Sequence, residues 1–404
     1  MLVEDYISLG LELGKHIPGL VDAYYGPGEF SQAAEHRPLL DPKYLADRAR
    51  SLIAGIDAGD KLDQFDQVDS GQRRRWLKAQ SIGLLTTARK LSGDEIDYLS
   101  EVKLCYGVAP RRVSKEEIDD AIGVLEQTFK GPGELRYRIS AYRESFAVDP
   151  ERLPLILNDL CELLRDQTAM IFGLPEGEEL EFEIVTGKPW SGFNYYLGNL
   201  KSKVAINSDL PVLSTSLAHL VAHEAYPGHH TEHSRKEVDL VNRRQQLEES
   251  IFLVGTPQCL LAEGLADFGL EILFGDDQFS EVSSLMVKRG IDYPDQELEQ
   301  TKAAFETLGK VRANAAWDLH QDGIPKDQVV LSLERDALLS RKRAEKSVEF
   351  LTDPTWRAYI TCYVEGFQLV RNFVNNPRHP NYLSRYERFR KLISEQLIPA
   401  DLDQ

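Results

Sequence analysis

Five of the nine histidines in this 404-residue sequence lie within positions 219–233. They are His219, His223, His229, His230 and His233. The segment reads SLAHLVAHEAYPGHHTEH, and Glu224 directly follows His223. Imidazole is the commonest metal ligand in proteins, and a neighbouring glutamate can act as a general base. The cluster therefore predicts a metal site that performs hydrolysis.

A hydrolytic zinc site uses three protein ligands and keeps a fourth position for water, whose pKa the metal lowers toward ~7. The common arrangement places two histidines four residues apart on one helix face. Here Pro227 occupies the position four residues after His223. On an unbroken helix His229 would lie ~9 Å further along the axis, too far for two N–metal bonds of ~2.0–2.1 Å. Because Pro227-Gly228 interrupts a helix, we expect a bulge there that brings His229 back to His223.

Two other histidine pairings stay open. His230 is the alternative second ligand, and otherwise it would contact substrate or support the ligands. His219 precedes His223 by four residues and can form an ordinary i, i+4 pair with it. A His219–His223 pair would not need the helix break at Pro227-Gly228.

The third ligand is expected from the segment LAEGLADFGLE, which begins at position 261. Glu263 lies there within an apolar helical pattern. Burying its carboxylate is costly unless the group is paired or bound to a cation. Asp267 and Glu271, on the following turns, are rival carboxylates.

The elements that must position these residues are mostly helical. Apolar residues recur at three- and four-residue spacing over 43–58, 73–92, 115–130, 151–173, 337–350, 355–374 and 382–397. Residues 180–207 instead alternate, which predicts three strands at about 180–186, 192–197 and 202–207. The helix with the histidines follows, with Asp209 as its expected N-cap and Pro211 just inside. The sequence thus predicts a mainly α fold with a small sheet before the metal-site helix, divided into a helical half (1–175) and a catalytic half (176–404).

Composition excludes several classes of protein. Lys and Arg number 47 against 65 Asp and Glu, which gives a net charge of −18 and argues against a nucleic-acid partner. No apolar run approaches the ~20 residues needed to cross a bilayer. The first residues lack the basic region and cleavage site of a signal peptide. The four cysteines are isolated, without a CxxC pair, as in proteins of a reducing compartment. We expect a cytoplasmic protein with no membrane partner; the sequence sets no oligomeric state.

The pair of motifs HEAYPGHH and AEGLADF resembles the bacterial "domain of unknown function 885" family, whose motifs run HExxPGHH and, some forty residues later, EGWA. The resemblance covers roughly residues 175–375. It implies a zincin-like, largely helical fold and a metallopeptidase with one Zn²⁺, held by His223, His229 and Glu263. Leu265 stands where the family has Trp, so the wall of the site differs.

The same resemblance suggests further site residues. Tyr363-x-x-Gly366 resembles a Tyr-x-x-Gly element of the family, and Tyr363 is the candidate donor to the oxyanion, with a core aromatic as the alternative. The segment RANAAWDLHQDG matches a family segment in part. Arg312 and His320 within it are expected to contact substrate or orient a ligand, with a structural hydrogen bond as the alternative for His320.

The resulting hypothesis is a zinc hydrolase that cleaves small peptides, with Glu224 as base and then acid. A zincin binds its peptide along an edge strand, for which residues 193–199 or 202–207 are the candidates. The alternative is a non-catalytic helical protein that retains a degenerate metal site. A di-iron or di-manganese protein would need two Glu-x-x-His motifs, and the sequence contains none.

Overall fold

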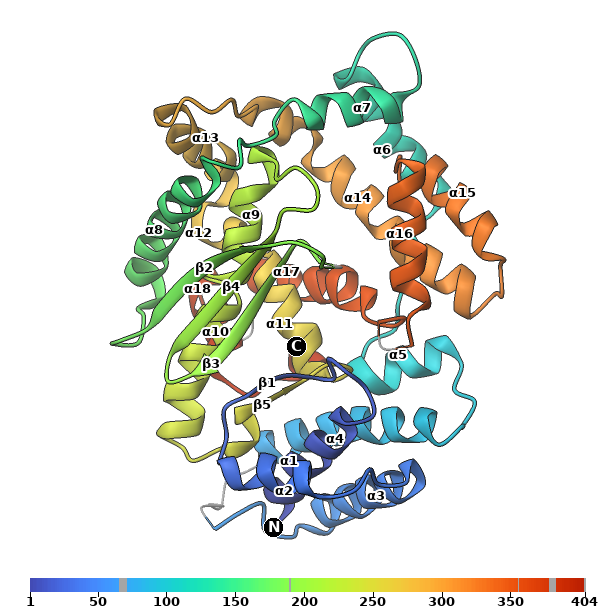
Figure 1. Ribbon diagram of the computed structural model, residues 1–404, viewed down its shortest axis with the longest axis vertical. Coiled ribbons are helices and arrows are strands. Elements are labelled where there is room, and N and C mark those ends of the chain that lie inside the picture. Colours follow the sequence, from blue (N-terminus) through green and yellow to red (C-terminus); the bar gives the residue numbers. More distant parts are fainter. Residues whose placement is uncertain (65–70, 189, 355, 378–382, 403–404) are drawn as a thin grey trace.

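The computed structural model describes residues 1–64, 71–188, 190–354, 356–377 and 383–402. The fold is mainly α, as predicted, with two small sheets among the helices (Figure 1). Thr355 and Tyr382, where two of the predicted helices begin, lie outside the described residues.

The N-terminal part consists of helices and one short strand. Its elements are α1 (Leu2–Gly14), β1 (Val21–Tyr24), α2 (Gly28–His36), α3 (Pro42–Ala58) and α4 (Gly71–Leu91). Helix α3 shows why the periodic segments have clear ends: the Asp41 side chain accepts a hydrogen bond from the Lys43 amide, and Pro42 fills the first position. Gly59 ends the helix in the left-handed conformation, with φ of 80°.

Four helices precede the larger sheet. They are α5 (Tyr98–Tyr106), α6 (Lys115–Thr128), α7 (Leu135–Glu144) and α8 (Leu153–Phe172). Ser114 and Glu117 form a capping box at the start of α6. The predicted helices over 115–130 and 151–173 are thus confirmed, each to within a few residues.

The larger sheet contains β2 (Glu179–Val185), β3 (Gly192–Gly198) and β4 (Lys201–Asn207), which confirms the three predicted strands. Strand β4 is central, parallel to β2 and antiparallel to β3. The expected N-cap at Asp209 is wrong, because α9 (Ser214–Glu224) begins five residues later. The Asp209 carboxylate instead accepts hydrogen bonds from the amides of Gly187 and Lys188.

The remaining elements follow α9 in the chain. They are α10 (His229–Lys236), a π-helix η1 (Glu237–Asn242), a 3-10 helix η2 (Leu247–Ser250), β5 (Ile251–Leu253), α11 (Pro257–Asp267), α12 (Gly269–Phe274), a 3-10 turn η3 (Gly275–Asp277), α13 (Gln278–Lys288), α14 (Asp295–His320), α15 (Lys326–Asp336), α16 (Arg341–Thr352), a π-helix η4 (Cys362–Gly366), α17 (Phe367–Asn375), α18 (Arg385–Ser394) and α19 (Pro399–Leu402). The predicted helix over 337–350 corresponds to α16, and the last two predicted segments contain η4 with α17 and α18.

Buried apolar side chains form two clusters. The smaller cluster combines residues of α1, α3 and α4 with Ile251 and Leu253 of β5. The larger one, apart from Ala23, takes residues from Tyr98 to Leu402. Along the chain the clusters therefore separate between α4 and α5, and α5–α8 pack with the later helices. Strand β1 pairs antiparallel with β5 and joins the N-terminal part to the segment just before α11.

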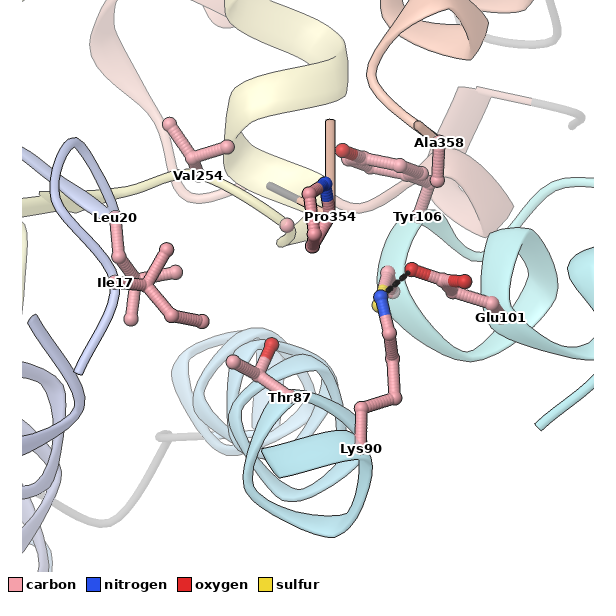
Figure 2. Close-up of a pocket in the computed structure, with 11 residues that line it drawn as sticks. Ile17, Leu20, Thr87, Lys90, Glu101, Tyr106, Val254, Pro354 and Ala358 are labelled. Carbon is pink, nitrogen blue, oxygen red and sulfur yellow. Dashed lines mark hydrogen bonds and ion pairs between the residues drawn. The ribbon is translucent and has the colours of Figure 1, made fainter. Parts of the chain in front are cut away.

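One small cavity lies where α4 and α5 meet the loops before α11 and η4 (Figure 2). Its volume is about 30 Å³, and its lining is mostly apolar, with an ion pair between Lys90 and Glu101 at one side. A space of this size holds about one or two water molecules. The cavity is therefore a packing defect rather than a substrate site.

The structure also bears on the apolar runs and on the cysteines. No helix among the described residues is both long enough and apolar enough to cross a bilayer. All four cysteines are free thiols, and those at positions 105, 259 and 362 are buried.

A buried carboxylate in η2 makes stability depend on pH. Burial raises the pKa of Glu249 to about 7 from its ordinary 4.5, although Lys236, 3.9 Å away, acts to lower it. The folded protein thus holds this proton more tightly than the unfolded chain, so the stabilisation present at low pH is lost as the pH rises through about 7. The difference is worth roughly 3 kcal/mol.

We therefore expect Glu249→Gln to exceed the wild type in free energy of unfolding by up to ~3 kcal/mol near pH 8 and by little near pH 4.5. The amide resembles the neutral acid in shape, and the hydrogen bond from Gln258 Nε2 (3.0 Å) is retained. Urea denaturation at both pH values measures the effect. A difference that does not change with pH would contradict it.

Candidate metal centre

The helix break expected at Pro227-Gly228 is present. Helix α9 ends at Glu224, α10 begins at His229, and the peptide bond before Pro227 is cis. The Gly228 amide donates to the Ala222 carbonyl at 3.0 Å. A Cβ at Gly228 would overlap the backbone carbonyl of His223, so only glycine allows this close return of the chain.

The break brings two imidazoles and a remote carboxylate together. The Nε2 atoms of His223 and His229 lie 3.2 Å apart. The two carboxylate oxygens of Glu263 on α11 lie one against each ring: Oε2 is 3.4 Å from His223 Nε2, and Oε1 is 3.4 Å from His229 Nε2. Tetrahedral ligands at ~2.0 Å from Zn²⁺ are separated by ~3.3 Å. The three side chains are therefore spaced as ligands of a single small divalent cation.

Glu224 also faces this point, so two carboxylates compete for the role of ligand. The ligand atoms of His223, Glu224 and His229 all lie within 4.8 Å of one another. Glu263 has an oxygen within 3.4 Å of each nitrogen, and its Oε2 is buried with no hydrogen-bond partner among the described residues. A buried oxygen in that state needs a cation or a donor. Glu263 therefore fits best as the third metal ligand, and Glu224 lies next to the site without binding the ion.

The electrostatic environment of the centre favours a positive charge between these groups. Burial acts to raise the pKa of Glu263, but His229 and His223 outweigh it and hold the pKa well below its usual range. The two imidazoles are desolvated, yet the carboxylates around them raise the pKa of His223 and of His229. Burial raises the pKa of Glu224, as a proton acceptor working near neutral pH requires.

Two supporting contacts orient the ligands. Asp267 Oδ1 lies 2.9 Å from His223 Nδ1, which therefore carries the proton and leaves Nε2 free for a metal. The Tyr359 hydroxyl donates to Glu263 Oε1 at 2.8 Å. Asp267 is thus a partner of a ligand rather than the ligand itself, and the sequence gives no signal for the role of Tyr359. Glu271, the other rival, forms an ion pair with Lys302 at 3.0 Å instead.

Tyr363 and His219 lie near the centre and are partly exposed to solvent. The Tyr363 ring is 6.5 Å from the His223 ring, and the residue is 37% exposed. His219 is exposed over 52% of its side chain, and its Nε2 is 3.7 Å from Asp267 Oδ1.

His230 and His320 are held in other networks. His230 is fully buried, with Nε2 2.9 Å from Glu178 Oε2 and Nδ1 2.8 Å from Ser202 Oγ. It therefore turns toward the sheet, away from the other two imidazoles. His320 Nε2 donates to the Leu351 carbonyl at 2.6 Å, which is the structural hydrogen bond weighed as its alternative. Arg312 is exposed on α14.

Strands β1 and β3 border the centre. Asn194 Nδ2 of β3 donates to the Glu224 carbonyl at 2.6 Å, and a Cβ at Gly192 would lie 3.1 Å from Glu224 Oε1. Asp22 on β1 was also missed by sequence reasoning. Burial raises its pKa to about 7, against the influence of His229. Its only sequence signal is a single acid in a short strand.

Helix α11 and the π-helix η4 meet backbone to backbone. A Cβ at Gly264 would overlap the Gly366 carbonyl, and a Cβ at Gly366 would overlap that of Leu260. Glu263 and Tyr363 are thus carried by two segments in direct contact. π-Helical turns are frequent at functional sites.

No protein-family model and no curated protein matches the chain. The fold is similar to a crystal structure described as "the putative lipoprotein from Colwellia psychrerythraea", with a TM-score of 0.55 and 15% identity over 89% of this chain and 65% of that one. A second structure, "a putative lipoprotein of unknown function from Shewanella oneidensis", gives 0.47 and 12% over 92% and 74%. The chain thus spans 65% of the length of the first, and that likeness concerns the fold alone.

Proposed function

We propose that the protein is a zinc-dependent hydrolase and, within that class, a metallopeptidase that cleaves small peptides. One observation carries the proposal: two imidazole nitrogens and a buried carboxylate converge at 3.2 and 3.4 Å beside Glu224. The resemblance of HEAYPGHH and AEGLADF to the "domain of unknown function 885" family supports the same chemistry.

Each residue of the centre has a role in this proposal. A bound Zn²⁺ would polarise the scissile carbonyl and lower the pKa of water. His223, His229 and Glu263 would hold it, while Asp267 fixes the His223 ring and Tyr359 fixes Glu263. The Glu224 carboxylate takes the proton from water and passes it to the leaving nitrogen. Tyr363 is the proposed donor to the developing oxyanion.

A peptide is the proposed substrate because a strand edge lies next to the centre. Of the two candidate strands, β4 is central in its sheet and β3 is at the outer position. Main-chain hydrogen bonds along β3 would align an extended peptide across Glu224. The contacts of Asn194 and Gly192 with Glu224 fix the distance between this edge and the proposed base.

The proposed location is the cytoplasm, as expected from the sequence. All four cysteines are free thiols, which persist in a reducing compartment. The two similar structures are described as putative lipoproteins, and that description is of those proteins and not of this chain.

The test combines metal binding with hydrolysis. We expect the purified protein to take up one equivalent of Zn²⁺ and, when loaded, to cleave members of a short-peptide library followed by mass spectrometry. A chelator should remove the activity, and added Zn²⁺ should restore it. Zinc binding without cleavage of any peptide would favour the non-catalytic alternative, and a protein that binds no divalent cation would refute the proposal.

A further inference from the structure

Glu178, the residue just before β2, connects the two sides of the helix break at Pro227-Gly228. Its Oε2 atom accepts a hydrogen bond from the Tyr226 hydroxyl and lies 2.9 Å from Nε2 of His230. Tyr226 directly precedes the break and His230 follows it, so one carboxylate oxygen holds both sides. The Tyr226 and His230 rings pack edge to face, with their centres 5.1 Å apart. We call these three residues the Glu178 clamp.

The Glu178 clamp is anchored to two elements outside the break. Arg165 of α8 donates to Oε1 of Glu178, with Nε at 2.8 Å and Nη2 at 2.6 Å. This guanidinium supplies the opposite charge that a carboxylate needs when only 1% of its side chain is exposed. On the other side, Nδ1 of His230 lies 2.8 Å from Oγ of Ser202, in the central strand β4. The clamp is therefore fixed to α8 and to the larger sheet.

The two histidine ligands differ in how their rings are held. Asp267 fixes the His223 ring through Nδ1, at 2.9 Å. In the described parts of the chain, no side chain or carbonyl forms a hydrogen bond with Nδ1 of His229, whose Nε2 faces the other ligands. His229 is also the first residue of α10, which begins without a side-chain cap. The position of this ring therefore depends on the backbone between Tyr226 and His230.

We infer that the Glu178 clamp positions His229 and thereby sets the affinity and the geometry of the metal centre. Holding both sides of the break keeps the return of the chain closed before a cation binds, so that less conformational freedom is lost on binding. The inference rests on the metal centre of the proposed function and adds Glu178, Tyr226 and His230 to it as positioning residues. They act through the backbone of His229 and not as ligands.

Zinc affinity tests the clamp without any substrate, by competition with a chromophoric chelator. We expect His230→Ala to weaken zinc binding by about 10–100-fold, the cost of losing an outer-shell partner. His230→Gln keeps a donor for Glu178 and should recover most of this loss, and Tyr226→Phe, which removes only a hydroxyl, should show a smaller one. His320→Ala is the matched control. It removes a histidine of α14 that donates to the Leu351 carbonyl at 2.6 Å, and it should bind zinc as the wild type does.

Cobalt supplies a second measurement, which a change in stability alone would not alter. The visible absorption of bound Co²⁺ depends on the arrangement of its ligands. At saturating Co²⁺ the spectrum of His230→Ala should differ from that of the wild type, whereas that of His320→Ala should not. If His230→Ala does not fold, Tyr226→Phe decides the question by the same two measurements.

Three results would overturn the inference. The first is a folded His230→Ala protein with the zinc affinity and the cobalt spectrum of the wild type. The second is an equal loss of affinity in His320→Ala, which would mean that metal binding follows the stability of the fold. The third is a wild type that binds neither ion, which would refute the proposed function as well. A wild type that binds zinc but hydrolyses no peptide contradicts the proposed function alone, because the clamp is judged on metal binding.

Discussion

Replacing Glu224 with Gln lowers turnover by about 10²–10⁴-fold, the usual contribution of a general base, while the protein keeps its metal. Gln has the size of Glu and retains the Asn194 contact, because that hydrogen bond is made to the backbone carbonyl of residue 224. It cannot accept a proton from water. Steady-state hydrolysis of a cleaved library peptide, combined with metal analysis of the same sample, measures both quantities.

Glu271→Gln is the matched control for this variant. Glu271 is a nearby carboxylate of α12 that pairs with Lys302 and Arg371, outside the metal centre. Its replacement should leave turnover close to that of the wild type. A zinc-loaded Glu224→Gln protein that hydrolyses peptides at the wild-type rate would show that another group moves the proton.

Replacing His229 with Ala should nearly abolish metal binding. The variant loses one of the two nitrogens that lie 3.2 Å apart, and two remaining ligands make a poor zinc site. We expect the affinity to fall by more than the roughly 10–100-fold that loss of an outer-shell partner costs. Competition with a chromophoric chelator measures the affinity, and circular dichroism verifies that the helices are retained.

His219→Ala distinguishes the two histidine pairs. His219 is four residues before His223, the spacing of an ordinary zinc helix, but its side chain is 52% exposed and its Nε2 contacts Asp267. This variant should bind zinc almost as the wild type does. Loss of zinc from His219→Ala with retention in His229→Ala would reverse the assignment of the ligands.

Local patterns predicted most of the elements that surround the centre. The alternation over 180–207 located all three strands, because side chains in a strand point to opposite faces. The apolar spacing over 43–58 and 115–130 predicted α3 and α6 to within two residues at each end. Asp209 is not an N-cap, because its carboxylate accepts hydrogen bonds from amides 21 and 22 residues earlier in the chain. No local sequence pattern predicts a contact over that distance.

The candidate centre was predictable where helix geometry limits the choices. His223 and His229 can bind one ion only if the chain between them folds back, and Pro227-Gly228 allows that break. In the structure the two Nε2 atoms lie 3.2 Å apart. The contact of Tyr359 with Glu263 joins residues 96 positions apart. That of His230 with Glu178 spans 52 positions. Such contacts depend on how α10, α11 and η4 pack, which periodicity does not encode.

The contact between Gly264 and Gly366 has a consequence for how substrate range can change. Because the two backbones already touch, Glu263 of α11 and Tyr363 of η4 are held on one rigid unit, and a side chain larger than hydrogen at either glycine would force the two helices apart. We therefore expect homologues of this chain to keep small residues at both positions and to diversify in what they accept through other residues around the centre.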